Sequence, residues 1–514
     1  MIRNLENRRK FLKAATLGGV ASVGLGTSTF AFENFEFKDD KSLNNKLTLE
    51  GYISGSAYKP LQSITIRSTI KGKFIVRDNK ANVYSQSSPD SNSFTFLVGG
   101  AIGYQSVTLV DKSEKILDVI AVPVDCKTEI KDKAGVYNEL MRTLYASLVG
   151  EWGEYSIVRY KDQFYKLFVT WIRDHTHSLK AMKYFNAYVK DGFDIFALSQ
   201  RADGMVWDNI YRRKPERGWW DDVLAKGDFI KIFENDSSRE FKRQPVEADV
   251  EYLFVECLYY SWKACGDNAW MAQGLENAIK AMNYSMTDRY RWSEKYKLIK
   301  RGFTIDTWDF VHDYDHAQTG YGSGQCIDPD TNEFGIMFGD NNGFISSCKY
   351  LAEMLEVANR KVDAENWRKT GLEFQERLDK ISWNGDFYTH YVPENQDFWQ
   401  KRDIGKTDPS KQVSLSNAYA LNRGITHEQA TKIIKTYQKI RNEMPKGSPG
   451  EWYTIYPPFE HGFGKDNALW EYMNGGVITI VAGELAHAAF EHGFENYGVD
   501  ILKRINEIGK KQNN

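Results

Sequence analysis

The chain has 514 residues, of which 42% are hydrophobic and 26% are charged; this composition is ordinary for a soluble globular protein, and the length exceeds one typical core. Its formal net charge of −2 gives no electrostatic reason to expect a nucleic acid or an anionic membrane surface as partner. Aromatic residues reach 14%, with 14 Trp and 29 Tyr, side chains that combine an apolar face with a polar group. We therefore expect a soluble protein of two domains.

The N-terminal segment has the pattern of an export signal. Asn7-Arg-Arg-Lys-Phe-Leu-Lys13 precedes a Gly- and Ala-rich, weakly apolar stretch that runs to about Ala31. It resembles a twin-arginine signal peptide, although Asn7 stands where Ser or Thr is more usual. No later segment is a long uncharged apolar run. We expect residues 1–31 to be the signal and the mature protein to be periplasmic or secreted, without membrane contact; a basic amphipathic anchor is the alternative.

Short runs of alternating polarity follow between residues 46 and 128. They include Ser63–Arg67, Lys73–Arg77, Ser93–Leu97 and Ser106–Val110. A period of two with many β-branched residues indicates half-buried strands, and several short strands in succession are typical of a small β-sandwich. Because the stretch contains no cluster of catalytic residue types, we expect an accessory β-sandwich domain.

From about residue 134 to 510 the apolar residues recur at helical spacing. The predicted helices are Val136–Leu148, Ala248–Cys265, Trp270–Tyr284, Asn341–Asn359, Asp363–Leu378, His427–Ile440 and Thr479–Phe490. Two of them end in helix-stop sequences, Cys265-Gly-Asp and Glu491-His-Gly. Long aromatic and Gly-rich loops lie between the helices, and such loops in a compact domain are usually functional. We expect a mostly α domain, a helical toroid of hairpins with a cleft at one rim.

Trp171-Ile-Arg-Asp174 is the first of three segments that place an acidic side chain beside an aromatic ring. We expect it to end one helix and to begin a turn before the next. Arg173 and Asp174 could hold adjacent hydroxyl groups of a ligand, one residue donating and the other accepting. The alternative is that Asp174 caps a helix and Arg173 forms a structural salt bridge.

The second segment, Gly302–Phe310, contains two carboxylates, Asp306 and Asp309, beside Trp308. A general acid that works near neutral pH needs a raised pKa, which burial against Trp308 could supply. The alternatives are a solvated surface loop and a metal site, for which the spacing of acidic and His residues here is not diagnostic.

The third segment is Trp470-Glu-Tyr-Met-Asn-Gly-Gly476. Its Gly pair allows the backbone to approach a ligand closely, and Glu471 could activate a water molecule. The alternative is a turn before a helix, with Glu471 in solvent. Two carboxylates with aromatic platforms are what the cleavage of a glycosidic bond requires: one protonates the leaving oxygen and the other activates water.

Neither a cofactor nor a metal is expected. The five cysteines form no CxxC pair and lie near no His at a zinc-like spacing, and Asp328–Asn332 lacks the Gly and the distal Glu of an EF-hand loop. Glu247 and Asp249 precede a predicted helix, where acidic side chains complement the helix dipole. The alternative for these two residues is that they face the cleft.

The three segments, in this order, resemble the six-hairpin glycosidase superfamily, whose catalytic domain is an (α/α)6 barrel. Trp171–Asp174 resembles a W-x-R-D segment that lines the terminal-sugar subsite of processing α-glucosidase I and related enzymes. Thr307–Phe310 is similar to the Gly-Trp-Asp-Phe-Ser segment of trehalases and that glucosidase family, whose Asp is the general acid. Asp340–Phe344 resembles their Asp-x-Asn-Ala pattern, and Asn474–Val477 resembles an Asn-Gly-Gly-Val/Ile-Trp segment of several barrel glycosidases.

The resemblance implies an exported glycoside hydrolase that acts on an oligo- or polysaccharide, with Asp309 as the acid and Glu471 as the base. Inversion, the outcome in most related families, requires the two carboxyl groups to lie roughly 6.5–9.5 Å apart. Thr307 and Val311 depart from the family pattern, so Asp306 competes for the acid role, and Glu484 competes for the base role. The substrate-binding residues implied are Trp171, Arg173, Asp174, Trp308, Asp340, Trp470 and Asn474.

Two other functions fit the same sequence. Helical toroids also host polysaccharide lyases, for which Tyr314, His312 and Arg301 supply the residue types needed for elimination beside a uronate carboxylate. A glycan-binding protein on an inactive barrel would keep the aromatic residues and be indifferent to the loss of Asp309 or Glu471. An unsaturated product distinguishes the lyase from the hydrolase.

Overall fold

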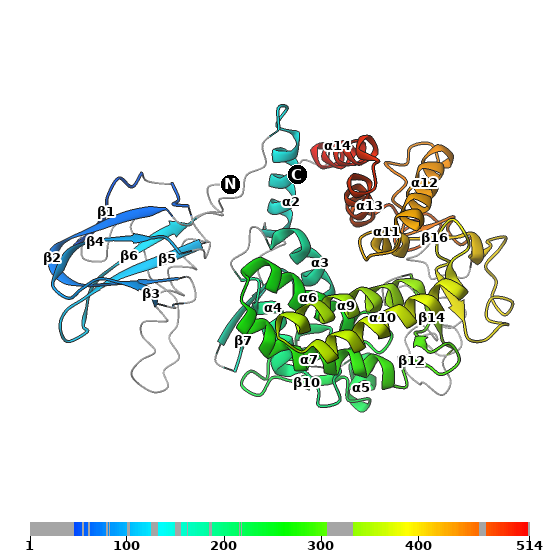
Figure 1. Cartoon of the computed structure of the whole chain (residues 1–514), viewed down its shortest axis with the longest axis horizontal. Coiled ribbons are helices and arrows are strands. Elements are labelled where there is room, and N and C mark those ends of the chain that lie inside the picture. Colours follow the sequence, from blue (N-terminus) through cyan, green and yellow to red (C-terminus); the bar gives the residue numbers. More distant parts are fainter. Residues whose placement is uncertain are drawn as a thin grey trace. The chain divides into compact units, whose positions relative to one another are not determined.

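The computed structural model describes residues 46–511, apart from 54–55, 60–61, 79–80, 82, 100–102, 125–131, 150–155, 162, 184–187, 215, 217, 306–332 and 462–468. The signal peptide expected at residues 1–31 and the Asp328–Asn332 turn lie outside the described residues. Contacts divide the chain into two compact units, Met1–Glu129 with Met182–Tyr188, and Ile130–Ala181 with Val189–Asn514 (Figure 1). Among the described helices, none combines the length and the apolar character that crossing a membrane requires.

The first unit consists of antiparallel strands. They are β1 (Leu47–Leu49), β2 (Ser63–Arg77), β3 (Val83–Gln86), β4 (Ser91–Leu97), β5 (Gly103–Val110) and β6 (Ile116–Val124). The order along the main path is β1-β2-β5-β6, and β3 and β4 also pair with β2. The N-terminal half of β2 pairs with β1 and β4, whereas its C-terminal half pairs with β3 and β5.

One prediction for this unit was wrong: Ser63–Arg67 and Lys73–Arg77 are not two strands but parts of one 15-residue strand, β2. The strand passes from one set of partners to the other around Gly72, where its pairing with β4 also shifts register. A Cβ at position 72 would lie 2.7 Å from the carbonyl oxygen of Val110. Glycine therefore permits the close approach that keeps β2 continuous.

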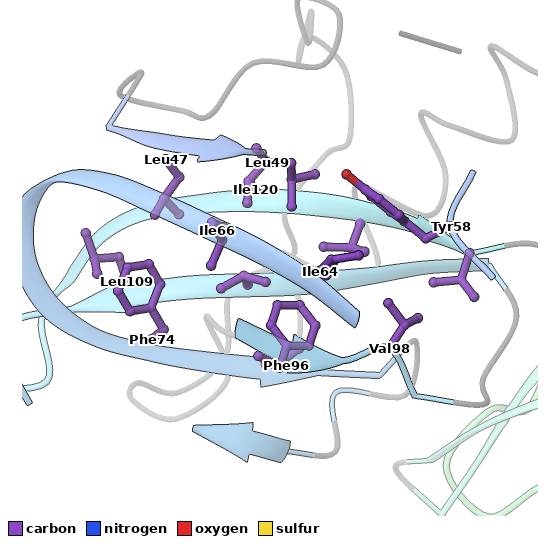
Figure 2. Packing of buried hydrophobic residues seen from close by; sticks show 14 residues of the cluster. Leu47, Leu49, Tyr58, Ile64, Ile66, Phe74, Phe96, Val98, Leu109 and Ile120 are labelled. Atoms are coloured by element: carbon purple, nitrogen blue, oxygen red, sulfur yellow. The ribbon is translucent and has the colours of Figure 1, made fainter. Parts of the chain in front are cut away.

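Alternate residues of these strands form the core of the first unit. Phe74, Val76, Val107 and Leu109 are completely buried and belong to one hydrophobic cluster (Figure 2). Their positions follow the period-two pattern of the sequence, because successive side chains of a strand point to opposite faces.

The second unit is mostly helical (Figure 1). Its helices are α2 (Val136–Val149), α3 (Ile172–Met182), α4 (Asp191–Ser199), α5 (Trp219–Lys226), α6 (Val250–Cys265), α7 (Asn268–Thr287), α9 (Phe338–Val357), α10 (Lys361–Ser382), α11 (Ser416–Leu421), α12 (His427–Glu443), α13 (Thr479–Glu491) and α14 (Glu495–Lys511), with a short 3₁₀ turn at Pro409–Lys411. All seven helices predicted from periodicity are confirmed, and each end lies within four residues of its predicted position.

Short two- and three-stranded sheets connect the helices. Their strands are β7 (Ser156–Tyr160), β8 (Gln163–Leu167), β9 (Asn209–Arg212), β10 (Ile230–Ile232), β11 (Arg239–Lys242), β12 (Trp292–Ser293), β13 (Leu298–Ile299), β14 (Gly335–Met337), β15 (Tyr391–Pro393), β16 (Val413–Ser414) and β17 (Ile455–Tyr456). All of these pairs are antiparallel.

Helices of the second unit pack as sequential pairs, α6 with α7, α9 with α10, α11 with α12 and α13 with α14. The first members of the pairs also contact one another in succession, α6 with α9, α9 with α11, and α11 with α13. Local sequence fixes the ends of several of these helices. Gly266 takes a left-handed conformation directly after α6, and Thr426 with Gln429 forms a capping box at the start of α12.

Candidate active site

The Trp171–Asp174 segment lies at the start of α3. Trp171 forms an isolated β-bridge with Asn209, and the backbone N–H of Ile172 donates to the carbonyl oxygen of Asp208 at 2.9 Å. Arg173 and Asp174 therefore belong to the first turn of α3. The prediction that this segment ends a helix was wrong, because the residues before it form strand β8, which pairs with β7 and buries alternate side chains.

Arg173 is held by two buried carboxylates, an arrangement that we call the Arg173 clamp. Its Nε donates to Oδ2 of Asp249 at 2.5 Å, and its Nη2 donates to Oδ1 of Asp249 at 2.7 Å. Nη2 also lies 2.7 Å from Oε2 of Glu247. The Arg173 side chain is 14% exposed, that of Asp249 3% and that of Glu247 1%. Such a two-point Arg–carboxylate contact fixes the plane of the guanidinium as well as its position.

Sequence reasoning did not find the clamp. It favoured dipole complementarity for Glu247 and Asp249, but Asp249 makes no side-chain capping bond to α6, and its carboxylate faces Arg173. The partners are separated by more than 70 residues of sequence, so only tertiary structure brings them together. The signal available was an Arg-Asp pair in one segment and a Glu-x-Asp pair before a helix in another.

Further buried carboxylates surround the clamp. Asp208 accepts a hydrogen bond from the backbone N–H of Gln244 at 2.6 Å. Asp340, in the first turn of α9, lies 3.4 Å from Nη1 of Arg301, and both side chains are almost completely buried. We call Asp208, Glu247, Asp249 and Asp340 the acidic cluster. Arg243 adds another buried cation beside it, paired with Glu251 at 2.9 Å.

The pKa values within the acidic cluster diverge. Burial raises the pKa of Asp208 well above its usual range, and the nearby charge of Glu247 raises it further. Burial also raises the pKa of Glu247. Burial opposes the ionisation of Asp249 as well, yet the charge of Arg173 and its hydrogen bonds outweigh that effect and hold the pKa of Asp249 below its usual range. Neighbouring carboxyl groups that prefer different protonation states are a common feature of sites of acid–base chemistry.

Asp340 also has a raised pKa. Burial raises the pKa of Asp340 to about 6, although Arg301 opposes the shift, and the nearby Asp249 adds to it. Its Oδ2 atom is buried and has no hydrogen-bond partner among the described residues. Asp340 is one of the predicted substrate-binding residues, and the structure places it beside Arg301 in the protein interior.

We expect Asp340 to make stability depend on pH between about 4 and 6. In the unfolded chain an Asp has a pKa of about 3.9. Across this interval the folded protein keeps a proton that the unfolded chain has released, so the free energy of unfolding falls as the pH rises and levels off above about pH 6. The loss amounts to about 3 kcal/mol at about 1.4 kcal/mol per pKa unit. Urea unfolding at successive pH values, for the wild type and Asp340→Asn, measures it.

The variant should lose the contribution of Asp340 to this slope, whatever its absolute stability, whereas Asp208 and Glu247, whose pKa values are also raised, should keep theirs. Asp386→Asn, which removes a carboxylate from an exposed turn, is the matched control and should keep the slope of the wild type. Parallel curves for the wild type and Asp340→Asn would show that Asp340 does not titrate in this range.

Asp174 and Trp171 are more accessible than the acids of the clamp. The Asp174 side chain is exposed, yet surrounding protein still desolvates the carboxyl group and raises its pKa, against the effect of Arg173. The Trp171 ring is partly buried and packs edge-on against Tyr211, with ring centroids 5.7 Å apart. Arg173 and Asp174 thus lie in the first turn of α3, directly after an aromatic residue.

One to two turns further along α3, polar contacts connect this helix with α11 and α13. The His177 ring stacks on Tyr419 with centroids 5.2 Å apart. Lys180 lies 3.0 Å from Oε1 of Glu484, and the side-chain amide of Asn422 donates to Oε2 of Glu484 at 2.5 Å. Glu484, the weaker candidate for the base, is therefore held in an ion pair. Burial opposes its ionisation, but Lys180 outweighs that effect and lowers the pKa of Glu484.

The third predicted segment forms a tight turn. Glu471 and Trp470 are exposed, whereas Asn474 is buried. The Asn474 amide donates to the carbonyl oxygen of Phe459 at 3.0 Å and accepts from the Phe459 N–H at 2.8 Å. Asn474, predicted to bind substrate, thus uses its side chain to fix the neighbouring backbone. Glu471 lies where water can reach it.

The structure brings Arg173, Asp174 and Asp340 into or beside the acidic cluster, and it groups Trp470, Glu471 and Asn474 in the turn. Asp306, Trp308 and Asp309 lie outside the described residues. The acid role of Asp309, and the competing role of Asp306, therefore stay predictions.

No protein-family model and no curated protein matches the chain. Among solved structures, a rhamnosidase from Klebsiella oxytoca with rhamnose bound is similar over 87% of this chain and 79% of its own, with 10% identity and a TM-score of 0.42. A GH63 mannosylglycerate hydrolase from Thermus thermophilus in complex with glucose is similar over 72% and 89%, with 13% identity and a TM-score of 0.43. An alpha-L-rhamnosidase from Dictyoglumus thermophilum is similar over 92% and 48%, with 10% identity and a TM-score of 0.40. These three solved structures are thus glycosidases by name.

Proposed function

We propose that this protein is an exported glycoside hydrolase that cleaves an oligo- or polysaccharide. The observation that carries the proposal is the Arg173 clamp with Asp174 beside it. Asp249 and Glu247 fix the guanidinium of Arg173, while Asp174 is exposed. A fixed donor next to an accessible acceptor can hold two neighbouring sugar hydroxyl groups, and Trp171 supplies an aromatic edge beside them.

We assign the chemistry to Asp309 as general acid and Glu471 as general base. Glu471 is exposed, which suits a residue that must hold and deprotonate water. Inversion would require about 6.5–9.5 Å between the two carboxyl groups, room enough for the attacking water. The acidic cluster would act behind this pair, orienting Arg173 and shaping the electrostatic potential at the sugar.

We further propose that the second unit is an (α/α)6 barrel with α3, α6, α9, α11 and α13 as five of its six inner helices. The successive contacts from α6 to α13 support this arrangement. Two side-chain contacts connect α3 with both ends of this series: the Thr176 hydroxyl donates to the carbonyl oxygen of Leu253 in α6 at 3.4 Å, and Lys180 pairs with Glu484 in α13. For the first unit we propose a β-sandwich, because β2 joins two sets of strands.

The polysaccharide lyase is a weaker alternative on this geometry. Its group for neutralising a uronate carboxylate would be Arg301, but Arg301 is completely buried and lies beside Asp340. A carboxylate already occupies that position. His312 and Tyr314, the other residues of that hypothesis, lie outside the described residues.

Product analysis tests the proposed function. We expect the mature protein, from about Phe32, to cleave members of a panel of α- and β-linked gluco-, manno- and rhamno-oligosaccharides. Mass spectrometry should then detect two products whose masses add up to the mass of the substrate plus one water. Anomeric NMR of the first products gives the stereochemistry. Unsaturated, ultraviolet-absorbing products would identify a lyase instead, and binding without turnover would favour the glycan-binding alternative.

Export through the twin-arginine pathway is part of the proposal and rests on Asn7–Lys13. Cell fractionation checks it: the wild-type protein should reach the periplasm or the medium, and a variant with Arg8→Lys and Arg9→Lys should stay in the cytoplasm. Equal export of both would contradict this route.

A further inference from the structure

The turn formed by residues 470–476, which we call the Glu471 turn, is tied to its surroundings by many hydrogen bonds. Within it, the N–H of Trp470 donates to the carbonyl oxygen of Asn474 at 3.0 Å. The N–H of Asn474 donates to the carbonyl oxygen of Glu471 at 2.8 Å. The Thr454 hydroxyl donates to the carbonyl oxygen of Met473 at 2.9 Å and accepts from the N–H of Gly475 at 3.1 Å. With the two bonds between Asn474 and Phe459, these contacts fix the turn on both sides.

Two bulky residues in this turn adopt an unusual backbone conformation. Trp470 has φ of 71° and Tyr472 has φ of 36°, in or near the left-handed region that glycine favours. For a bulky side chain this conformation is strained and persists only where the surrounding structure enforces it; residues of this kind concentrate at ligand-binding and active sites. A glycine at position 472 would satisfy the backbone better than tyrosine does.

Both strained residues are partly exposed to solvent. Trp470 is 39% exposed and Tyr472 is 52% exposed, and the exposed Glu471 stands between them. Tyr453 and Tyr456 brace the Trp470 ring, with centroids 5.6 Å and 6.1 Å from it. A rigid turn thus holds aromatic, acidic and aromatic side chains in succession at the surface, a combination that core packing does not require.

We propose that Trp470 and Tyr472 form an aromatic platform for two sugar units beyond the one that Arg173 and Asp174 would hold, so that the substrate is an oligo- or polysaccharide longer than a disaccharide. This inference rests on the proposed function and deepens it. A pyranose ring has an apolar face of C–H groups that suits a Trp or Tyr ring. Two residues apart, the Cα atoms of Trp470 and Tyr472 are separated by about 7 Å at most, comparable with the length of one sugar unit.

Binding measurements with a series of chain lengths test the platform. In the full mature chain carrying Asp309→Asn, which keeps the sugars intact, isothermal titration measures the affinity for α-1,4- and β-1,4-linked gluco-oligosaccharides and for rhamno-oligosaccharides, from disaccharide to hexasaccharide. We expect affinity to rise with length. Tyr472→Gly and Trp470→Ala should each weaken binding of the longer members by about 2- to 12-fold, as expected for loss of one aromatic contact.

Tyr472→Gly separates a binding role from a structural one. Because it relieves the backbone, its Tm should be unchanged or higher while its affinity falls. Phe164→Ala, which removes a ring that is 64% exposed on β8, is the matched control and should alter neither. A lower Tm with unchanged affinity would overturn the platform, as would affinity that is independent of chain length in the parent protein. If the wild type hydrolyses the sugars but Tyr472→Gly does not change the affinity, the proposed function stands and the platform does not. If binding depends on chain length but the wild type hydrolyses none of the sugars, the platform stands and the proposed function does not.

Discussion

Asp309→Asn and Glu471→Gln are each expected to lower kcat/KM by about 10²–10⁴-fold, the usual contribution of a general acid or base. The amide of Asn cannot protonate the leaving oxygen, and the amide of Gln cannot deprotonate water. The effect should fall mainly on kcat, because both groups act on the reacting bond rather than on the bound sugar. Initial rates on the best substrate of the panel, measured for each purified variant with its unfolding midpoint, check this result.

Controls decide between the competing carboxylates. Glu428→Gln changes an exposed residue of α12 and should keep full activity. Asp306→Asn should keep most of the activity; if it abolishes turnover while Asp309→Asn stays active, Asp306 is the acid. Activity that survives Glu471→Gln would remove Glu471 from the mechanism.

Helix positions in the second unit could be predicted because the periodic signal is local. The α6 helix, for example, combines an apolar repeat with a Gly stop at residue 266, and both features act within a few residues. The prediction divided β2 into two strands because a Gly within a strand pattern indicates a break. Gly72 instead allows close contact with Val110 inside one continuous strand. The start of α3 was misplaced for a related reason: β7 and β8 form a hairpin whose partners are recognisable only as a pair.

The site was predictable only as a set of residue types. Arg173 was identified in the sequence, but the acids that hold it, Glu247 and Asp249, follow from tertiary contacts between α3 and the start of α6. Asp340 was selected for a resemblance at the start of α9, and nothing in that local pattern indicates complete burial beside Arg301. Burial and long-range pairing determine pKa values, so the divergence within the acidic cluster had no counterpart in the sequence.

Arg173→Ala is expected to destabilise the protein by about 3–5 kcal/mol, since it leaves the buried carboxylates of Asp249 and Glu247 without their cation. Arg173→Lys restores a charge without the two-point contact to Asp249, so its stability should lie between those of the wild type and Arg173→Ala. Its activity should nevertheless stay low, because the planar donor beside Asp174 is lost. Urea unfolding at pH 7 gives the stabilities, and kcat and KM on the cleaved oligosaccharide give the activities.

The pH dependence of this loss provides the sharpest check on the clamp. Arg173 holds the pKa of Asp249 below its usual range, so the stabilisation is present above about pH 4 and fades as the pH falls through the depressed value. In Arg173→Ala the uncompensated Asp249 can take up a proton, and the difference in the free energy of unfolding from the wild type should therefore shrink towards pH 4.

Adding Asp249→Asn to Arg173→Ala should recover part of the lost stability at pH 7, because the variant no longer buries that charge. Lys411→Ala, which breaks an exposed pair with Asp408, should cost at most about 1 kcal/mol. If Arg173→Ala lowers the free energy of unfolding by a comparably small amount, the buried carboxylates do not need Arg173 for their stabilisation. The sugar-binding role, which depends on the fixed position of Arg173, would then be contradicted as well.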